Sequence, residues 1–444
     1  MIKREILNHL NQWRNRSDRR PLILRGARQV GKTTVVQEFG RSFDLFLPLN
    51  LERRRDAALF ENADDARELL DEIHIHLGKR KTNGSTLLFI DEIQQSPRAV
   101  GMLRYLYEDL PELHVIAAGS LLENLMDVQA SFPVGRVEYM AMRPCSFLEF
   151  LEAVGDEADA EVVRSIRVKS IHERLMRRFR QYVLTGGMPA VVAHYAQHSD
   201  MLAMDHLYES LLTSYRDDAG KYAKNESQRS LLAHILQAGW AEAAETITLN
   251  GFAGSSYKSR EVGEALRTLE RAMLLEMVYP VIEPRAPMLS NMARKPKLIW
   301  LDTGLVNYQA GMRNELLSTP SIMDVWRGRM SEQVTAQELL ANDHRVSAKR
   351  QFWARDRREG AAEVDFVIRH DMMAVPIEVK SGHNSRLRSL HSYMDSTPHS
   401  LAIRVWDQPL TVDRVSTPSG KEFTLINLPF YYISQIHSII DSSL

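Results

Sequence analysis

Residues 21–40 read PLILRGARQVGKTTVVQEFG, and this stretch decides the fold of the N-terminal part of the chain. Three apolar residues at 22–24 predict a short buried strand, and the apolar spacing after residue 33 predicts a helix. Between the two lies a complete match to the pattern G-x-x-x-x-G-K-[ST]. The order of strand, glycine-rich loop and helix predicts an α/β fold with a phosphate-binding loop (P-loop) at a helix N-terminus.

The chemistry of this loop indicates a nucleoside triphosphate and a magnesium ion. Glycines allow backbone N–H groups to turn toward the phosphates, Lys32 should reach the β- and γ-phosphates, and the Thr33 hydroxyl should hold Mg²⁺. We therefore predict ATP and Mg²⁺ as cofactors. The residues predicted to bind them are Gly26, Ala27, Arg28, Gln29, Val30, Gly31, Lys32, Thr33 and Thr34.

Two further apolar strands are expected to end at this site. Residues 87–90 read LLFI and lead into Asp91 and Glu92. Asp91 is predicted to bind Mg²⁺ through water and Glu92 to polarise the attacking water, which makes both residues catalytic together with Lys32. Residues 114–118 form a third strand that leads to Ser120, which either senses the γ-phosphate or is an ordinary helix N-cap.

Six stretches carry motifs that occur together: Gly26–Thr34, Leu88–Gln94, Ala117–Leu121, Gly135-Arg136, Pro144–Phe150 and Gly186–Pro189. They resemble the AAA+ superfamily, and more narrowly prokaryotic ATPases with the motifs GxRQVGKTT and LxFIDEIQ. The resemblance implies ATP at a subunit interface, and therefore a homo-oligomer such as a hexameric ring. Arg136 would then reach the nucleotide of a neighbouring subunit, or be an ordinary surface arginine. Arg28 and Arg143 compete with it for phosphate contact.

We predict five parts along the chain. Residues 1–150 form the P-loop ATPase core, 151–225 a helical lid, 226–290 a winged-helix-like region, 291–322 a connector and 323–444 a second α/β domain. Apolar residues at three- and four-residue spacings predict the helices of the lid. Near its end, four polar residues are interpreted as a solvated turn: Asp217, Asp218, Lys221 and Tyr222.

Residues 255–269 have the pattern of the second helix of a helix-turn-helix, and residues 273–281 are apolar enough for the hairpin of a winged helix. This helix either enters the major groove of DNA or only packs against the ATPase. The residues expected to face the core are Val262, Leu266 and Leu269, and those expected outside are Lys258, Arg260 and Arg267.

The C-terminal part contains two short apolar strands with charges at alternate positions, EVDFVI at 363–368 and VPIEVK at 375–380. Period-two geometry allows Asp365, Glu378 and Lys380 to converge if the strands pair. Two carboxylates bind a hard divalent cation, and a neighbouring lysine activates water or steadies a scissile phosphate. Glu332, on a helix predicted over residues 323–340, would add a metal ligand.

This pattern resembles the core of the PD-(D/E)xK nuclease fold, although Val364 replaces the proline before the aspartate. The resemblance implies an α/β nuclease-like domain that either cleaves nucleic acid or serves only as a scaffold. Basic residues with interleaved aromatics, Phe352 and Trp353, either track phosphates with a ring available for stacking or form a solvated loop. The basic residues are Lys349, Arg350, Arg355, Arg357, Arg358, Arg386 and Arg388.

The composition of the chain limits which classes of protein and which kinds of binding surface remain possible. The chain has 444 residues, 44% of them hydrophobic and 25% charged, with a net charge of −1. This balance is that of a globular protein and requires any DNA-binding surface to be a local patch. The single cysteine, Cys145, excludes an intramolecular disulfide. With no signal peptide pattern and no apolar run of roughly 18 residues, we expect a cytoplasmic protein without membrane contact.

The leading hypothesis is a Mg²⁺-dependent ATPase that acts as a DNA-directed motor or remodelling factor with a nuclease-like C-terminal domain. One alternative is an ATP-dependent switch or protein-remodelling factor whose C-terminal domain is a non-catalytic scaffold. The other is a defence-type sensor in which nucleotide state controls a nuclease.

Overall fold

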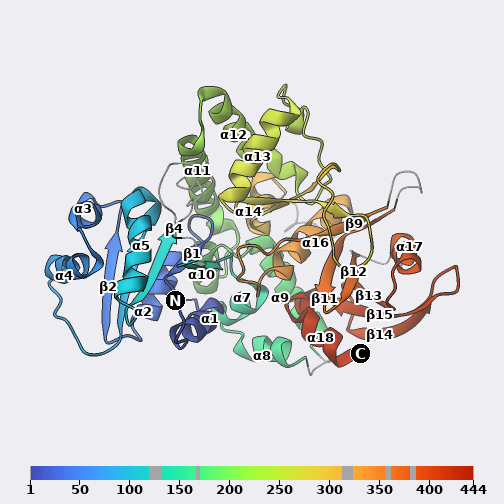
Figure 1. Ribbon diagram of the computed structural model, residues 1–444. Coiled ribbons are helices and arrows are strands. Elements are labelled where there is room, and N and C mark those ends of the chain that lie inside the picture. The colour runs from blue at the N-terminus through green and yellow to red at the C-terminus, as the bar shows by residue number, and fades with distance from the viewer. Residues whose placement is uncertain are drawn as a thin grey trace.

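A five-stranded parallel sheet forms one end of the molecule in the computed structural model, which describes residues 2–119, 133, 135–166, 171–312, 324–355, 362–380 and 387–443 (Figure 1). The strand order is β2-β3-β4-β1-β5. Each of the three predicted strands is present, and every neighbouring pair runs parallel. The strands are β1 (Leu22–Arg25), β2 (Leu45–Asn50), β3 (Thr86–Asp91), β4 (His114–Gly119) and β5 (Glu138–Ala141).

Both faces of this sheet are buried because alternate residues of each strand enter different hydrophobic clusters. In β1, Leu22 and Leu24 pack with Val36, whereas Ile23 packs with Leu69 and Leu103 on the other face. The covering helices are α1 (Ile6–Arg14), α2 (Lys32–Gly40), α3 (Arg54–Asn62), α4 (Ala66–Leu77) and α5 (Pro97–Asp109). This layering leaves the carboxyl ends of the strands as the place where a ligand can bind.

Helices dominate the middle of the chain, as the sequence predicts (Figure 1). The segment interpreted as a solvated turn is instead the end of α11, and Asp218 is buried there. The interpretation was wrong because the partner that buries this carboxylate lies far away in the sequence. The helices are α7 (Phe147–Ala153), α8 (Glu157–Ser165), α9 (His172–Thr185), α10 (Pro189–His198), α11 (Asp205–Tyr222), α12 (Glu226–Ala238) and α13 (Ser259–Arg271).

Helix α13 has the two faces expected from its sequence. Val262, Leu266 and Leu269 are buried, while the cationic residues on its other face are exposed. The strand that follows, β6 (Leu275–Val278), pairs antiparallel with β8 (Lys297–Trp300), which lies in the segment predicted as a connector. Trp300 of β8 stacks on Trp240, with the ring centroids 3.8 Å apart. Helix α14 (Thr303–Gln309) follows β8.

The C-terminal part is built on a second five-stranded sheet, of order β11-β12-β13-β15-β14, with parallel central pairs and antiparallel outer pairs. Strands β11 and β12 pair with Phe366 opposite Ile377, so the two charged stretches do form one hairpin-like unit. A small sheet joins β7 (Pro280–Val281) to β9 and β10. The other elements are α16 (Asp324–Leu339), β9 (Phe352–Ala354), β10 (Glu363–Val364), β11 (Phe366–His370), β12 (Met373–Val379), α17 (Arg388–Ser396), β13 (Leu401–Trp406), β14 (Thr411–Ser416), β15 (Glu422–Pro429) and α18 (Ile436–Ser443).

Among the helices that the structure describes, none combines the length and apolar character needed to cross a lipid bilayer.

Candidate nucleotide site

The P-loop connects the end of β1 to the first turn of α2, and its backbone requires glycine at two points. Gly31 has φ of 95°, a conformation that L-residues rarely adopt. At Gly26, a Cβ atom would lie 2.4 Å from the carbonyl oxygen of Met142, so a side chain cannot be accommodated without moving the backbone. These two positions hold the loop in the curve that directs its N–H groups toward a bound phosphate.

Lys32 is buried beneath this loop. Its ammonium donates hydrogen bonds to the carbonyl oxygens of Gly26 at 2.9 Å and Ala27 at 3.0 Å. Burial lowers the pKa of Lys32 to about 8. Among the described residues no carboxylate lies within ion-pair distance of the ammonium, so the phosphates of a nucleotide can draw it out of its carbonyl contacts.

The residues expected to hold Mg²⁺ are in contact. The Thr33 hydroxyl donates to Asp91 Oδ2 at 2.7 Å, and Asp91 is the buried last residue of β3. One hydroxyl and one carboxylate suit Mg²⁺, which takes its other ligands from phosphates and water. Glu92 follows in a left-handed conformation, with φ of 53°, and accepts a hydrogen bond from Gln94. Burial raises the pKa of both carboxyl groups, Asp91 and Glu92.

A cavity of about 520 Å³ extends from the P-loop. One wall carries the polar residues Arg28, Lys32, Thr33 and Glu92, and the rest is mostly apolar. A mostly apolar lining next to a phosphate-binding loop is suited to the base of a nucleotide. The apolar residues are Ile2, Leu7, Val35, Pro189, Ala190 and Ala193.

Sequence reasoning did not identify Arg4, which packs against the P-loop and stabilises it. Arg4 Nη1 donates to the carbonyl oxygen of Val30 at 3.0 Å, and its Nε lies 3.0 Å from Glu149 Oε1. Nη2 donates to the carbonyl oxygen of Arg143 at 2.7 Å. A single arginine near the N-terminus has no spacing signal, so only the fold could reveal this role.

Helix α11 of the middle region contacts the P-loop directly. Arg28 forms an ion pair with buried Asp218, and its carbonyl oxygen accepts a hydrogen bond from Tyr215 OH at 3.1 Å. Gln29 Nε2 donates to Ser214 Oγ at 3.1 Å. Two P-loop residues are therefore held by one face of a helix that lies almost two hundred residues later in the chain.

The other arginine candidates lie elsewhere. Arg136 is 44% exposed and its Nε is 3.1 Å from Glu108 Oε1. Arg143 faces the C-terminal part, where it donates to the carbonyl oxygens of Asp343 at 3.1 Å and Arg345 at 3.4 Å. Burial, reinforced by the nearby Arg350, lowers the pKa of Arg143 to about 10. Ser120 lies outside the described residues.

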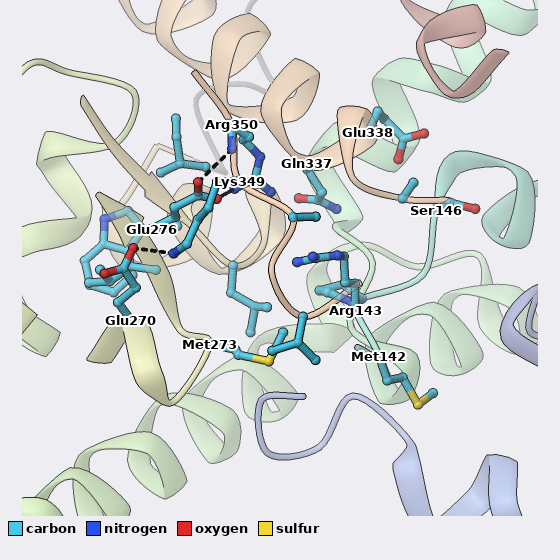
Figure 2. Close-up of a pocket in the computed structure, with 18 of the residues that line it drawn as sticks. Met142, Arg143, Ser146, Glu270, Met273, Glu276, Gln337, Glu338, Lys349 and Arg350 are labelled. Carbon is cyan, nitrogen blue, oxygen red and sulfur yellow. Dashed lines mark hydrogen bonds and ion pairs between the residues drawn. The ribbon is translucent and has the colours of Figure 1, made fainter. Parts of the chain in front are cut away.

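Figure 2 shows a second cavity, of about 230 Å³, where the ATPase core meets α13, β6 and the C-terminal part. Arg143 points into it from the ATPase side. On the opposite wall Lys349 pairs with Glu270 at 2.8 Å and Arg350 pairs with Glu276 at 2.6 Å. Lys349 and Arg350 belong to the predicted basic patch, and each forms an ion pair within the chain.

The aromatic residues of that patch are also unable to contact a nucleic acid. Phe352 is 1% exposed and Trp353 is 2% exposed, so neither can stack on a nucleobase. The prediction of a stacking ring was wrong because both side chains are core residues of β9. Arg357, Arg358 and Arg386 lie outside the described residues.

The fold does bring together the C-terminal residues that were predicted as a metal site, but a lysine lies among them. Lys297 Nζ is 2.7 Å from Glu332 Oε2 and 3.9 Å from Asp365 Oδ1. Lys380 Nζ is 2.6 Å from Glu378 Oε1. Among the residues that the structure describes, no group of three or more histidines, cysteines or carboxylates is placed to hold a metal ion.

Lys297 was missed because its segment, at the start of an apolar strand, gave no chemical signal. The only indication in the sequence was a lysine directly before the buried run LIWL, where a charge needs a partner.

Three family models match the chain. Residues 18–151 match an AAA domain, residues 176–316 a domain of unknown function (DUF8612) and residues 327–418 another domain of unknown function (DUF4143). No curated protein sequence matches this chain.

Several solved structures are similar at low sequence identity. The Walker-type ATPase PABY2304 of Pyrococcus abyssi is 14% identical, covers 70% of this chain and 96% of its own, and gives a TM-score of 0.45. The Aeropyrum pernix ORC1 protein in complex with DNA is 12% identical, covers 69% of this chain and 91% of its own, and gives a TM-score of 0.31. At such values these structures assign no partner to this chain. The P-loop geometry and the AAA match together identify residues 18–151 as an AAA-type P-loop ATPase domain.

Proposed function

We propose that this chain is a Mg²⁺-dependent ATPase that works as a nucleotide-controlled switch, in which phosphate binding at the P-loop competes with the contact between the P-loop and α11. The observation that carries this proposal is the ion pair between Arg28, within the P-loop, and Asp218 of α11. A guanidinium in a phosphate-binding loop is attracted by both anions, and contact with a phosphate would draw it from the position in which it pairs with Asp218. ATP binding therefore changes how firmly α11 is held.

The residues of the site have distinct roles in this scheme. Lys32 leaves the carbonyl oxygens of Gly26 and Ala27 to contact the phosphates. Thr33 and Asp91 would hold Mg²⁺, which would neutralise charge that develops on the phosphates. Glu92 orients the attacking water and accepts its proton. These roles follow from the contacts of each side chain and from the general chemistry of phosphoryl transfer.

Hydrogen bonds connect the ATPase core to the C-terminal part, so a conformational change in the core can reach the C-terminal part. Ala141, the last residue of β5, donates its N–H to the carbonyl oxygen of His344 at 2.6 Å, and the N–H of Phe147 donates to Glu338 Oε1 at 3.1 Å. The segment after β5 is thus bonded to α16 and the loop that follows it. A shift of the ATPase core is transmitted through these bonds rather than through a flexible linker.

The experiment compares hydrogen exchange of residues 205–222 with and without ATP, in the parent chain and in Asp218→Asn. ATP should accelerate exchange of α11 in the parent, while Asp218→Asn should exchange fast without ATP and bind ATP about threefold to tenfold more tightly. Asp217→Asn is the matched control, because Asp217 is exposed on the same helix. Unchanged α11 exchange in a parent chain that hydrolyses ATP would refute the switch.

A DNA-directed role is the second candidate, and the exposed face of α13 favours it. Arg260 and Arg267 are seven residues apart and both exposed on that face, and Lys258 is exposed at the N-cap of the helix, where all three can approach phosphates. ATP hydrolysis should be measured with single-stranded, duplex and branched DNA, with Lys32→Ala as the blank. Stimulation that disappears in Arg260→Ala/Arg267→Ala supports DNA as the partner, whereas an unchanged rate with every DNA points to a protein partner.

A homo-oligomer, such as a hexameric ring, fits the same proposal if Arg136 completes the site of a neighbouring subunit. Arg136 is 44% exposed and, among the described residues, pairs with Glu108, which leaves it able to reach across an interface. Arg136→Ala and Lys32→Ala should each be inactive alone. Mixing the two variants should restore part of the activity, because one subunit then supplies an intact P-loop and the other the arginine. No recovery on mixing excludes this role.

A further inference from the structure

A buried lysine lies in the position where a nuclease-like carboxylate cluster would bind a cation. Lys297 is 2% exposed, and its ammonium is 2.7 Å from Glu332 Oε2 and 3.2 Å from Glu363 Oε1. Asp365 Oδ1 follows at 3.9 Å. Three carboxylates from α16, β10 and the β10–β11 junction thus surround one ammonium supplied by β8.

The surroundings of Lys297 leave it little freedom to move away. Its backbone is fixed by β pairing with Val278 and by a bridge to Thr246. The ammonium also lies 5.3 Å from the ring centre of Phe352 and 5.7 Å from that of Phe366, at distances where aromatic faces stabilise a cation. Burial disfavours the charged form, but the neighbouring carboxylates outweigh this effect and raise the pKa of Lys297.

Two of the remaining carboxylate oxygens have other partners. Asp365 Oδ2 accepts the N–H of Val379 at 2.7 Å, and Glu378 Oε1 is 2.6 Å from Lys380 Nζ. Glu378 Oε2 is buried without a hydrogen-bond partner among the described residues. A divalent ion needs several oxygen ligands in a regular arrangement, and here at least one oxygen of each of the four carboxylates already faces an ammonium or a backbone N–H.

We propose that Lys297 is the resident cation of the cluster formed by Glu332, Glu363, Asp365 and Glu378, and that it takes the place of a divalent metal ion. A second cation on Glu332 or Asp365 would be repelled by an ammonium only a few ångströms away. The cluster therefore joins β8 to the C-terminal sheet and does not perform metal-dependent cleavage of nucleic acid. This inference is independent of the proposed ATP switch.

The test measures Mn²⁺ binding to the full nucleotide-free chain by electron paramagnetic resonance. The variants are Lys297→Met, Lys297→Met/Asp365→Asn and the matched control Lys295→Met, whose lysine is exposed two residues earlier. Lys297→Met should gain one Mn²⁺ per chain, bound at least about tenfold more tightly than by the parent, and Asp365→Asn should remove this gain. Lys295→Met should behave like the parent.

Two results overturn the proposal. One is a parent chain that binds Mn²⁺ at this cluster, recognised because Asp365→Asn or Glu378→Gln abolishes the binding. The other is a folded Lys297→Met chain that gains no Mn²⁺. If Lys297→Met does not fold, the test uses the parent chain alone. The melting temperature of the parent should be the same with and without 1 mM Mn²⁺. A rise in this temperature that is lost in Asp365→Asn contradicts the proposal.

Discussion

Two buried lysines of this chain, Lys32 and Lys297, are surrounded by opposite kinds of neighbours. Lys32 is held by the carbonyl oxygens of Gly26 and Ala27, and its pKa is lowered to about 8 by burial. Lys297 is surrounded by carboxylates, and its pKa is raised. Carbonyl dipoles hold an ammonium weakly and leave it free to bind an anion, whereas carboxylates neutralise it in place. Burial alone therefore does not indicate what a lysine does.

The largest expected effect is on stability. Lys297→Ala should lower the free energy of unfolding by about 2–4 kcal/mol, because it removes a buried ammonium and leaves three neighbouring carboxylates, which are partly exposed or exposed, to repel one another without their cation. Lys32→Ala should change it by less than about 1 kcal/mol, since only two carbonyl contacts are lost. Urea denaturation followed by circular dichroism measures both, with Lys295→Ala as the surface control. If both substitutions lowered the free energy of unfolding equally, the proposed difference between a neutralised lysine and a loosely held one would be wrong.

The second effect is on catalysis. Lys32→Ala should lower the rate of ATP hydrolysis by roughly 10²- to 10³-fold, because a positive charge next to the transferring phosphoryl group is lost. Steady-state phosphate release measures this rate. Glu92→Gln is the companion variant, which should bind ATP normally and hydrolyse it slowly. A Lys32→Ala chain with near-normal turnover would assign hydrolysis to another site.

The third effect is a pH dependence of nucleotide binding. The pKa of Lys32 is about 8 in the nucleotide-free chain, and phosphates favour its charged form, so binding is coupled to proton uptake above that pH. Affinity for ATP should be constant below pH 8 and fall above it, by up to about tenfold per pH unit. Fluorescence titration from pH 7 to 9.5 tests this. Lys32→Arg should show a flat profile, because a guanidinium remains charged.

The smallest effect is expected at Lys380, the lysine of the C-terminal cluster that remains partly exposed. Its partner Glu378 is buried but Lys380 itself is 27% exposed, so losing this pair should cost about 1–2 kcal/mol of stability, less than losing Lys297. Lys380→Met should also leave the rate of ATP hydrolysis unchanged. Thermal denaturation and phosphate release provide the two readings. A loss as large as that of Lys297→Ala would show that both lysines, and not Lys297 alone, neutralise the cluster.

The parts of the fold that could be predicted depend on residues close together in sequence. The P-loop, β1 and α2 follow from one stretch of twenty residues, and the contact between Thr33 and Asp91 follows because parallel strands end at the same edge of a sheet. The strand pairing that gathers Asp365 and Glu378 was predictable from charges at alternate positions. Each of these inferences needs only local periodicity and one rule of sheet geometry.

The remaining features depend on contacts between distant segments. Asp218 is polar and lies near a helix end, so its sequence resembles that of a solvated turn until Arg28 is placed beside it. Lys297 reaches Glu332 and Glu363 only because β8 pairs with β6 and packs against α16, which no pattern in one segment encodes. In both cases the charge was visible in the sequence but its partner was not.

The bond between Ala141 and His344 has a consequence for dividing this chain. Ala141 ends β5, the outermost strand of the ATPase sheet, and His344 occupies both its N–H and, through Nδ1 at 3.2 Å, its carbonyl oxygen. A fragment that stops before residue 324 would expose these groups on an open strand edge, where another chain can pair with them. The C-terminal part therefore covers this end of the strand edge, and its removal would leave Ala141 open to pairing with another chain.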